Sequence, residues 1–205
     1  LDLQFGNANV LLDLEDNGGF VRLLELEGAP DENFLRGIMM KHPSGIDLLC
    51  APQQIAPLHS IASQDMATLF DVLRAEYDYV IVDLPRALVE WVEPVLERAS
   101  TLLIVLDSSV PSVRQAKRIG DFYRQANIGI DVEYVVNHEA KPFMRSESQK
   151  EAEAVLETKF QHWIPDNAKV ARKAVDLGKP VAEMAANSDM GKAFKKLAQA
   201  IREAQ

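Results

Sequence analysis

Residues 77–99, YDYVIVDLPRALVEWVEPVLERA, decide the fold of this chain. An uninterrupted apolar run over residues 79–82 leads into one carboxylate, Asp83, and Pro85 follows two positions later. Apolar residues then recur at helical spacing over residues 92–99. A strand that is apolar on both faces is typical of a parallel sheet covered by helices on both sides. The stretch therefore predicts a buried strand that ends in an acid and precedes an amphipathic helix.

Strand and helix patterns alternate along the rest of the chain. This order predicts an α/β fold, namely a three-layer, mostly parallel twisted sheet of about seven strands with helices on both faces. The other predicted strands cover residues 1–5, 45–50, 101–106, 130–136 and 160–164. The other predicted helices cover residues 18–27, 64–76, 113–125, 147–159, 168–177 and 191–203.

Composition narrows the class of protein. The 205 residues are 47% hydrophobic, which is ample for a core, and we expect residues 1–205 to form a single domain. Lys and Arg number 22 against 31 Asp and Glu, so the net charge of −9 disfavours sequence-independent nucleic-acid binding, which uses clustered cations. The single cysteine, Cys50, has no internal partner for a disulfide. We expect it to be a buried apolar side chain in a reducing cytosol.

Ligands of such sheets bind at the carboxyl ends of the strands. Asp83 there is a magnesium ligand acting through water, as in nucleotide hydrolases, an N-cap for the next helix, or a turn-former before Pro85. Asn137 either reads a base edge with its amide, which is both donor and acceptor, or forms a turn. Asp107 is expected to serve only as a helix cap. The full set of polar candidates at strand ends is Asp2, Asp83, Asp107, Asn137 and the pair Pro165 and Asp166.

Several other kinds of site are disfavoured. The four histidines, at positions 42, 59, 138 and 162, do not pair with each other or with Cys50 at the spacing of zinc ligands. No G-x-S-x-G nucleophile elbow and no G-x-x-x-x-G-K-[ST] phosphate loop occurs in the 205 residues. The longest apolar runs fall short of the about 20 residues that cross a membrane. A zinc site, a hydrolase or protease with a serine nucleophile, and a membrane-spanning segment are therefore all disfavoured.

Two features allow more than one interpretation. Trp91 lies beside the apolar stripe of its helix, so its ring either packs in the core or anchors a contact with a partner. Lys192, Lys195 and Lys196 lie on the last predicted helix, which also has an apolar face. That helix either lies on a membrane surface or, as we expect, packs on the sheet with its lysines in solvent.

The chain resembles the MinD/ParA superfamily of deviant-Walker ATPases over its whole length and in the correct order. Within that superfamily it is most similar to the CpaE/TadZ branch, which is associated with assembly and polar placement of Tad (Flp) pili. The segments that carry the resemblance are LDLQFGNANVLLDLE (1–15), HPSGIDLLCAP (42–52), YDYVIVDLPRALVEWVEPVLERAS (77–100), LLIVLDSSVPSVRQAKR (102–118), VVNHEAK (135–141) and IPDNAKVARKAVDLGKPV (164–181).

The resemblance implies a P-loop NTPase fold, ATP and Mg²⁺ as cofactors, and roles for particular residues. Asp2 corresponds to the catalytic acid that positions the attacking water and faces magnesium, and Asp83 to the Walker-B acid that holds magnesium through water. Asn137 corresponds to the adenine-contacting residue, with Pro165 and Asp166 in the loop that closes over the base. The order Asp-Asn after Pro165 departs from the Asn-Asp or Glu-Asp of relatives.

The resemblance also implies partners and a location. We expect a homodimer that contacts pilus assembly or secretion proteins, binds no specific nucleic acid and touches the membrane only indirectly. The expected location is cytoplasmic, at a pole or at the inner face of the membrane. The functional expectation is a nucleotide-dependent dimerising switch. The alternatives are a non-hydrolysing scaffold of the same fold and a ParA-type partition ATPase.

Residues 1–205 have no counterpart of the superfamily's first strand, its phosphate loop or the helix after it. We therefore expect the chain to be the C-terminal piece of a longer protein. ATP hydrolysis is expected of that protein if an intact phosphate loop precedes Leu1, and it is not expected of residues 1–205 alone.

Overall fold

The computed structural model describes residue 4 and residues 6–57, 59–126 and 129–203. The chain divides into two compact units, each of which is described by itself. The first unit comprises Leu1–Arg98 together with Ala174–Pro180, and the second comprises Ala99–Lys173 together with Val181–Gln205. Among the described residues, no helix is both long and apolar enough to cross a membrane.

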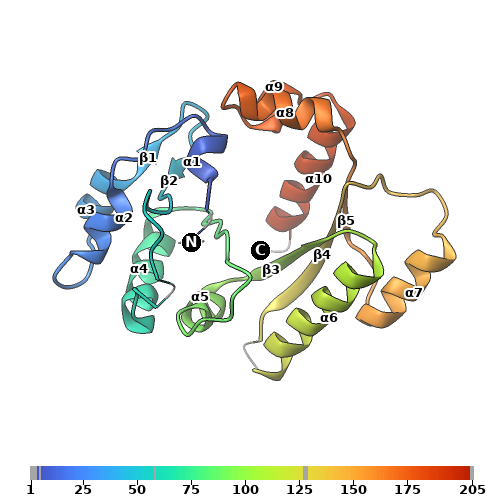
Figure 1. Ribbon diagram of the computed structural model, residues 1–205, viewed down its shortest axis with the longest axis horizontal. Helices are drawn as coiled ribbons and strands as arrows, with labels where there is room; N and C mark the ends of the chain where they lie inside the picture. The colour runs from blue at the N-terminus through green and yellow to red at the C-terminus, as the bar shows by residue number, and fades with distance from the viewer. Residues whose placement is uncertain (1–3, 5, 58, 127–128, 204–205) are drawn as a thin grey trace. The chain divides into compact units, whose positions relative to one another are not determined.

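The second unit is built on a parallel sheet (Figure 1). Its strands are β3 (Thr101–Leu106), β4 (Asp131–Asn137) and β5 (His162–Ile164), in that spatial order. Each connection between neighbouring strands contains one helix, α6 (Val110–Gln125) or α7 (Glu147–Leu156). Helices separate consecutive parallel strands because a parallel pair needs a long crossover connection.

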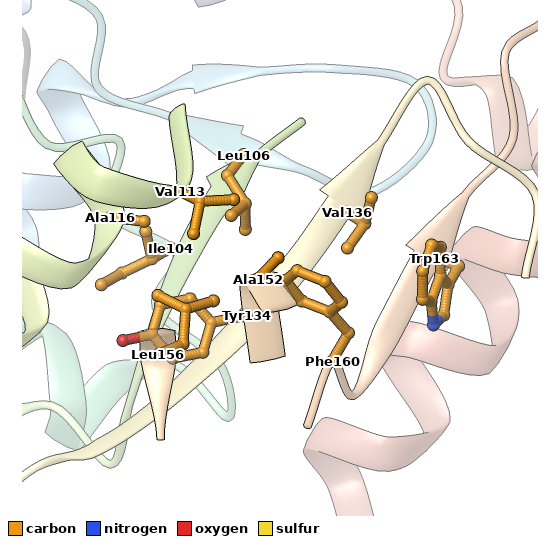
Figure 2. Packing of buried hydrophobic residues seen from close by; sticks show 10 residues of the cluster. All are labelled: Ile104, Leu106, Val113, Ala116, Tyr134, Val136, Ala152, Leu156, Phe160 and Trp163. Atoms are coloured by element: carbon orange, nitrogen blue, oxygen red, sulfur yellow. The ribbon is translucent and has the colours of Figure 1, made fainter. Parts of the chain in front are cut away.

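Side chains alternate across this sheet, so both faces are apolar and both are covered. On one face, Tyr134 and Val136 of β4 pack with α6, α7 and Trp163 of β5 (Figure 2). On the other face, Val135 of β4 and Ile164 of β5 pack with residues of α8 (Ala168–Asp176), α9 (Val181–Met184) and α10 (Asp189–Glu203). The result is helix, sheet, helix, which confirms the predicted three-layer α/β class.

The last helix, α10, packs on the sheet as expected. Met190, Ala193 and Leu197 of α10 pack against the sheet. The lysines of the same helix, Lys192, Lys195 and Lys196, are exposed. The apolar face of α10 is thus occupied by the protein's own core.

The first unit holds the remaining elements. The helices are α1 (Ala8–Leu11), α2 (Gly19–Leu24), α3 (Glu32–Ile38), α4 (Ser63–Glu76) and α5 (Val92–Arg98). The strands β1 (Met40–Lys41) and β2 (Asp47–Leu48) form an antiparallel pair. Helices α4 and α5 pack together. Trp91, immediately before α5, is only 1% exposed, so the core interpretation of Trp91 is confirmed.

The turn between β1 and β2 is fixed by His42. Its Nδ1 accepts a hydrogen bond from the backbone N–H of Ser44 at 3.1 Å, so its Nε2 is the nitrogen that donates to the carbonyl of Gly178 at 3.0 Å. Gly178 has φ +58, a left-handed conformation that suits glycine. This buried imidazole joins the hairpin turn to the segment Ala174–Pro180 of the same unit.

The strand predicted over residues 79–82 was wrong. Residues 79–82 form no strand, and the side chains of Tyr79 and Ile81 are 46% and 83% exposed. The described residues contain five strands rather than about seven. A strand needs a neighbour for its backbone N–H and C=O groups, and in the described part of the chain none pairs with residues 79–82. The prediction over residues 1–5 lies mostly outside the described residues.

Candidate functional site

The carboxyl edge of the β3-β4-β5 sheet brings three polar segments together. Asp107 follows β3, Asn137 ends β4, and Pro165 and Asp166 follow β5. Asn137 stands opposite Ile164 in the parallel register, so Pro165 continues directly beside it. Parallel strands end at a common edge, and the order β3-β4-β5 places the β4 residue between the other two.

Glu139 braces the loops at this edge. Its backbone N–H donates to the carbonyl of Ile164 at 3.0 Å, which ties the segment after β4 to β5. Its side-chain Oε1 accepts hydrogen bonds from both the backbone N–H, at 3.1 Å, and the hydroxyl of Ser108, which ties the same segment to the loop after β3. Glu139 therefore ties the loops after β3 and β4 to the end of β5. Sequence reasoning missed Glu139, and its position two residues after Asn137 was the only available signal.

His138 has an unusual backbone conformation for a residue with a side chain. Its φ is +64, in the left-handed region that residues other than glycine adopt infrequently. The Nδ1 of His138 lies 3.4 Å from Oδ1 of Asp166, and both side chains are mostly exposed, at 70% and 62%. An exposed pair at this distance contributes little to stability. The contact places the Asp166 carboxylate beside the imidazole of His138, the residue that follows β4.

Asp107 has a local structural role, as expected, although it is not itself the helix cap. Its Oδ1 accepts a hydrogen bond from the backbone N–H of Ser109 at 2.9 Å, and its own N–H donates to the hydroxyl of Ser112 at 3.2 Å. The residue at the N-cap of α6 is Ser109. The hydrogen bonds from Ser109 lower the pKa of the Asp107 carboxyl. Asp107 is therefore occupied in forming the turn that begins α6.

Of the two acids predicted to act on magnesium, the structure describes only Asp83. Asp2 lies outside the described residues. Asp83 is exposed and follows a segment that is not a strand, so the predicted strand-end position of Asp83 was wrong. Because Asp83 belongs to the first unit and Asn137 to the second, their common rim stays a prediction. In the described part of the chain, no three His, Cys, Asp or Glu side chains gather to hold a metal ion.

The edge around Asn137 presents an amide and a carboxylate that can form hydrogen bonds. The Asn137 amide offers a donor and an acceptor, and the Asp166 carboxylate offers acceptors. Phosphate recognition uses a glycine-rich cradle of backbone N–H groups with a lysine, and the sequence over residues 1–205 contains no such motif.

Comparison with known proteins finds similarity to MinD and ParA proteins. No family model matches the chain. The septum site-determining protein MinD of Thermotoga maritima is 25% identical over 207 residues, which cover 98% of this chain and 74% of that protein. A ParA family ATPase from Chlorobium tepidum has a TM-score of 0.81 and 21% identity, covering 97% of this chain and 83% of the other.

Two solved MinD structures are also similar. The cell division ATPase MinD of Pyrococcus furiosus has a TM-score of 0.71 and 19% identity, covering all of this chain and 84% of its own. A chain of the MinC:MinD cell division protein complex of Aquifex aeolicus has a TM-score of 0.74 and 19% identity. The match covers 98% of this chain and 81% of the other. The chain thus has the α/β fold of these ParA and MinD structures, and its sequence is similar to that of the Thermotoga MinD protein.

Proposed function

We propose that the protein is a nucleotide-dependent dimerising switch of the MinD/ParA type that acts in assembly or polar placement of Tad (Flp) pili. The observation that carries the nucleotide part is the arrangement of Asn137 beside Pro165 and Asp166 at the carboxyl edge of the sheet. The pilus part rests on the CpaE/TadZ-like segments at residues 42–52 and 77–100. A ligand moves the equilibrium between monomer and dimer only through its different affinities for the two states.

In this proposal Asn137 and Asp166 orient the base, and Asp83 and Asp2 act on the magnesium and the attacking water. Two subunits enclose the nucleotide, and hydrolysis releases them. The native protein, purified from its own cells, provides the test. ATP with Mg²⁺ should shift it from monomer toward dimer in sedimentation velocity, ADP should not, and Asp83→Ala should abolish the shift. A dimer fraction that ignores ATP would overturn the switch.

A scaffold of the same fold is the second candidate, and nothing in residues 1–205 separates it from the switch. A scaffold binds its partners and itself equally well with ATP, with ADP and without nucleotide. The same sedimentation experiment therefore separates it from the switch.

A partition ATPase is the third candidate, favoured by the TM-score of 0.81 with the Chlorobium ParA family protein. Its expected behaviour is ATP-dependent binding of DNA that weakens steeply as salt is raised. The net charge of −9 opposes that binding. A DNA mobility shift across a range of salt concentrations tests this candidate directly.

A further inference from the structure

The imidazole of His138 lies in the middle of the candidate base site. His138 directly follows Asn137 at the end of β4, and its Nδ1 lies 3.4 Å from Oδ1 of Asp166, after β5. The pKa of the Asp107 carboxyl, after β3, is lowered mainly by hydrogen bonds from Ser109 and further by the positive charge that His138 carries when protonated. One ring therefore lies within electrostatic range of both neighbouring strand ends.

The backbone of His138 has an unfavourable conformation that helix termination does not explain. Among the described residues with side chains, Asp13 and Glu157 also have a positive φ, at +50 and +58, beside the +64 of His138. Those two residues lie at the ends of helices α1 and α7, where a left-handed residue is a common way to end a helix. His138 ends a strand instead, so its conformation needs another reason.

The turn after β4 accounts for the backbone of His138 but not for its side chain. The left-handed residue is followed by the N–H of Glu139, which donates to the carbonyl of Ile164 at 3.0 Å. Glycine would form the same turn at a lower cost, because it has no Cβ. The ring that the turn presents is 70% exposed, so it fills no part of the core. Residues held in unfavourable backbone conformations cluster at ligand sites, which directs attention to what this ring could bind.

An exposed imidazole that is held at one edge suits stacking against a heterocycle. The Nδ1 edge of the ring faces Asp166, which restricts its rotation, and most of the ring surface is open to solvent. Histidine is one of the aromatic side chains on which nucleic-acid bases stack. Asn137 and Asp166 offer hydrogen-bonding groups to the edge of a base, and neither offers an aromatic face. His138 supplies the kind of contact that the other two lack.

We propose that His138 is a positioning residue for the nucleotide, and that its imidazole stacks on the base whose edge Asn137 and Asp166 contact. This inference rests on the proposed nucleotide site and adds to it a residue and a kind of contact. The predicted ligand is a nucleotide whose base has a large aromatic face, so a purine is favoured over a pyrimidine. Inorganic triphosphate, which has no base, gains nothing from the ring.

Calorimetric titration of ATP with Mg²⁺ into the native protein and variants of it tests the inference. His138→Gly removes the ring and retains the turn, so ATP should bind about 10-fold more weakly while the melting temperature stays the same or rises. His138→Phe retains a flat ring and should recover most of the affinity. Glu157→Gly is the matched control, because it relaxes another left-handed residue of the second unit, at the end of α7, and should leave the affinity unchanged.

Inorganic triphosphate separates the base from the phosphates. Its binding should be the same in wild type and in His138→Gly. In aromatic NMR spectra, the ring C–H signals of His138, identified by their loss in His138→Phe, should move upfield with ATP, because a stacked base shields them. Triphosphate should move them little. The exposed His59 of the first unit provides the internal control and should not respond to either ligand.

The outcomes distinguish this inference from the proposed function. ATP affinity that falls in His138→Gly and returns in His138→Phe, with His138 signals that respond to the base, supports the stacking contact. A wild-type protein that binds no ATP overturns the proposed function and this inference with it. A wild type that binds ATP with an affinity unchanged in His138→Gly, or reduced equally for ATP and triphosphate, overturns the stacking contact alone.

Discussion

Asn137 at the end of β4 stands opposite Ile164 at the end of β5, and the backbone N–H of Glu139 closes the edge with a 3.0 Å hydrogen bond to the carbonyl of the same Ile164. The polar candidates of two strands are thereby held side by side. Ser108, after β3, joins them through the Glu139 carboxylate. At the candidate base site, hydrogen bonds from Glu139 therefore join the ends of β3, β4 and β5 to one another.

This brace gives a first prediction. Glu139→Ala should leave the backbone N–H of Ser108 without its acceptor and lower the free energy of unfolding by about 1 kcal/mol, since the site is half exposed and water replaces part of the bond. Glu139→Gln retains an amide oxygen as acceptor and should cost less. Urea denaturation measures both, and amide hydrogen exchange at Ser108 should accelerate in the alanine variant. If the amide of Ser108 exchanged at the same rate in the wild type and in the alanine variant, Glu139 would not hold the loop after β3.

The burial of Trp91 gives a second prediction. With 1% of its surface exposed, truncation to alanine should leave a large cavity and lower the free energy of unfolding by about 3–5 kcal/mol. Trp91→Phe retains most of the apolar volume and should cost clearly less. Chemical denaturation is the measurement. A Trp91→Ala protein as stable as the wild type would contradict the core position and revive the interface interpretation.

The contact between α6 and β4 gives a third prediction. A Cβ on Gly120 would lie 2.6 Å from the hydroxyl oxygen of Tyr134, which among the described residues is buried without a hydrogen-bond partner. Gly120→Ala should therefore destabilise the protein by about 1–3 kcal/mol through overpacking. Tyr134→Phe alone should change stability little, because the Arg124 guanidinium, which interacts with the hydroxyl, keeps its ion pair with Asp121.

The double variant makes this prediction specific. Removal of the hydroxyl makes room for the new methyl group, so Gly120→Ala with Tyr134→Phe should be more stable than Gly120→Ala alone. Additive effects in thermal or urea unfolding would show that the helix and strand are less closely packed than this distance implies.

Cys50 gives a fourth prediction, which concerns pH. Burial, with the hydrogen bond to Asp16, raises the pKa of the Cys50 thiol from 9.0 to about 12. Folding therefore favours the protonated thiol, and this contribution to stability is complete below pH 9 and is lost as the pH rises toward 12. Burial and the bond to Asp47 likewise raise the pKa of Tyr77 to about 12, which acts in the same direction.

The free energy of unfolding should accordingly fall between about pH 9 and 12, and Cys50→Ala should make that fall shallower without removing the part due to Tyr77. At pH 8 the native thiol should react slowly with a chromogenic disulfide reagent and quickly in urea. Rapid reaction of the native protein would show that Cys50 is accessible, against its 5% exposure.

The elements of the second unit were predictable because their signals are local. Continuous apolar runs marked β3 and β4, and the periodicity over residues 113–125 found α6, which begins three residues earlier at Val110 with Pro111 in its first turn. The positions of Asn137, Pro165 and Asp166 at strand ends followed from the same patterns. Local propensity and tertiary packing agree in this unit, which is why short-range reasoning succeeds.

The remainder depends on contacts between distant segments. Residues 79–82 have the composition of a buried strand, yet a strand forms only where a neighbour supplies hydrogen bonds, and sequence patterns do not reveal the neighbour. The brace from Glu139 to Ser108 spans 31 residues, and the bond from His42 to Gly178 spans 136. Such pairs carry no periodic signal, so the details of the site emerged only from the structure.

Titration of ATP and Mg²⁺ into isotope-labelled residues 1–205, followed by two-dimensional amide NMR, tests the proposed base site most directly. Without a phosphate cradle, binding should be too weak for calorimetry to detect at micromolar concentrations. At millimolar ATP, chemical-shift changes should centre on Asn137 and Asp166, and Asn137→Ala should remove them while Asp107→Ala leaves them. Changes that bypass the ends of β4 and β5, or micromolar affinity that survives Asn137→Ala, would contradict the account.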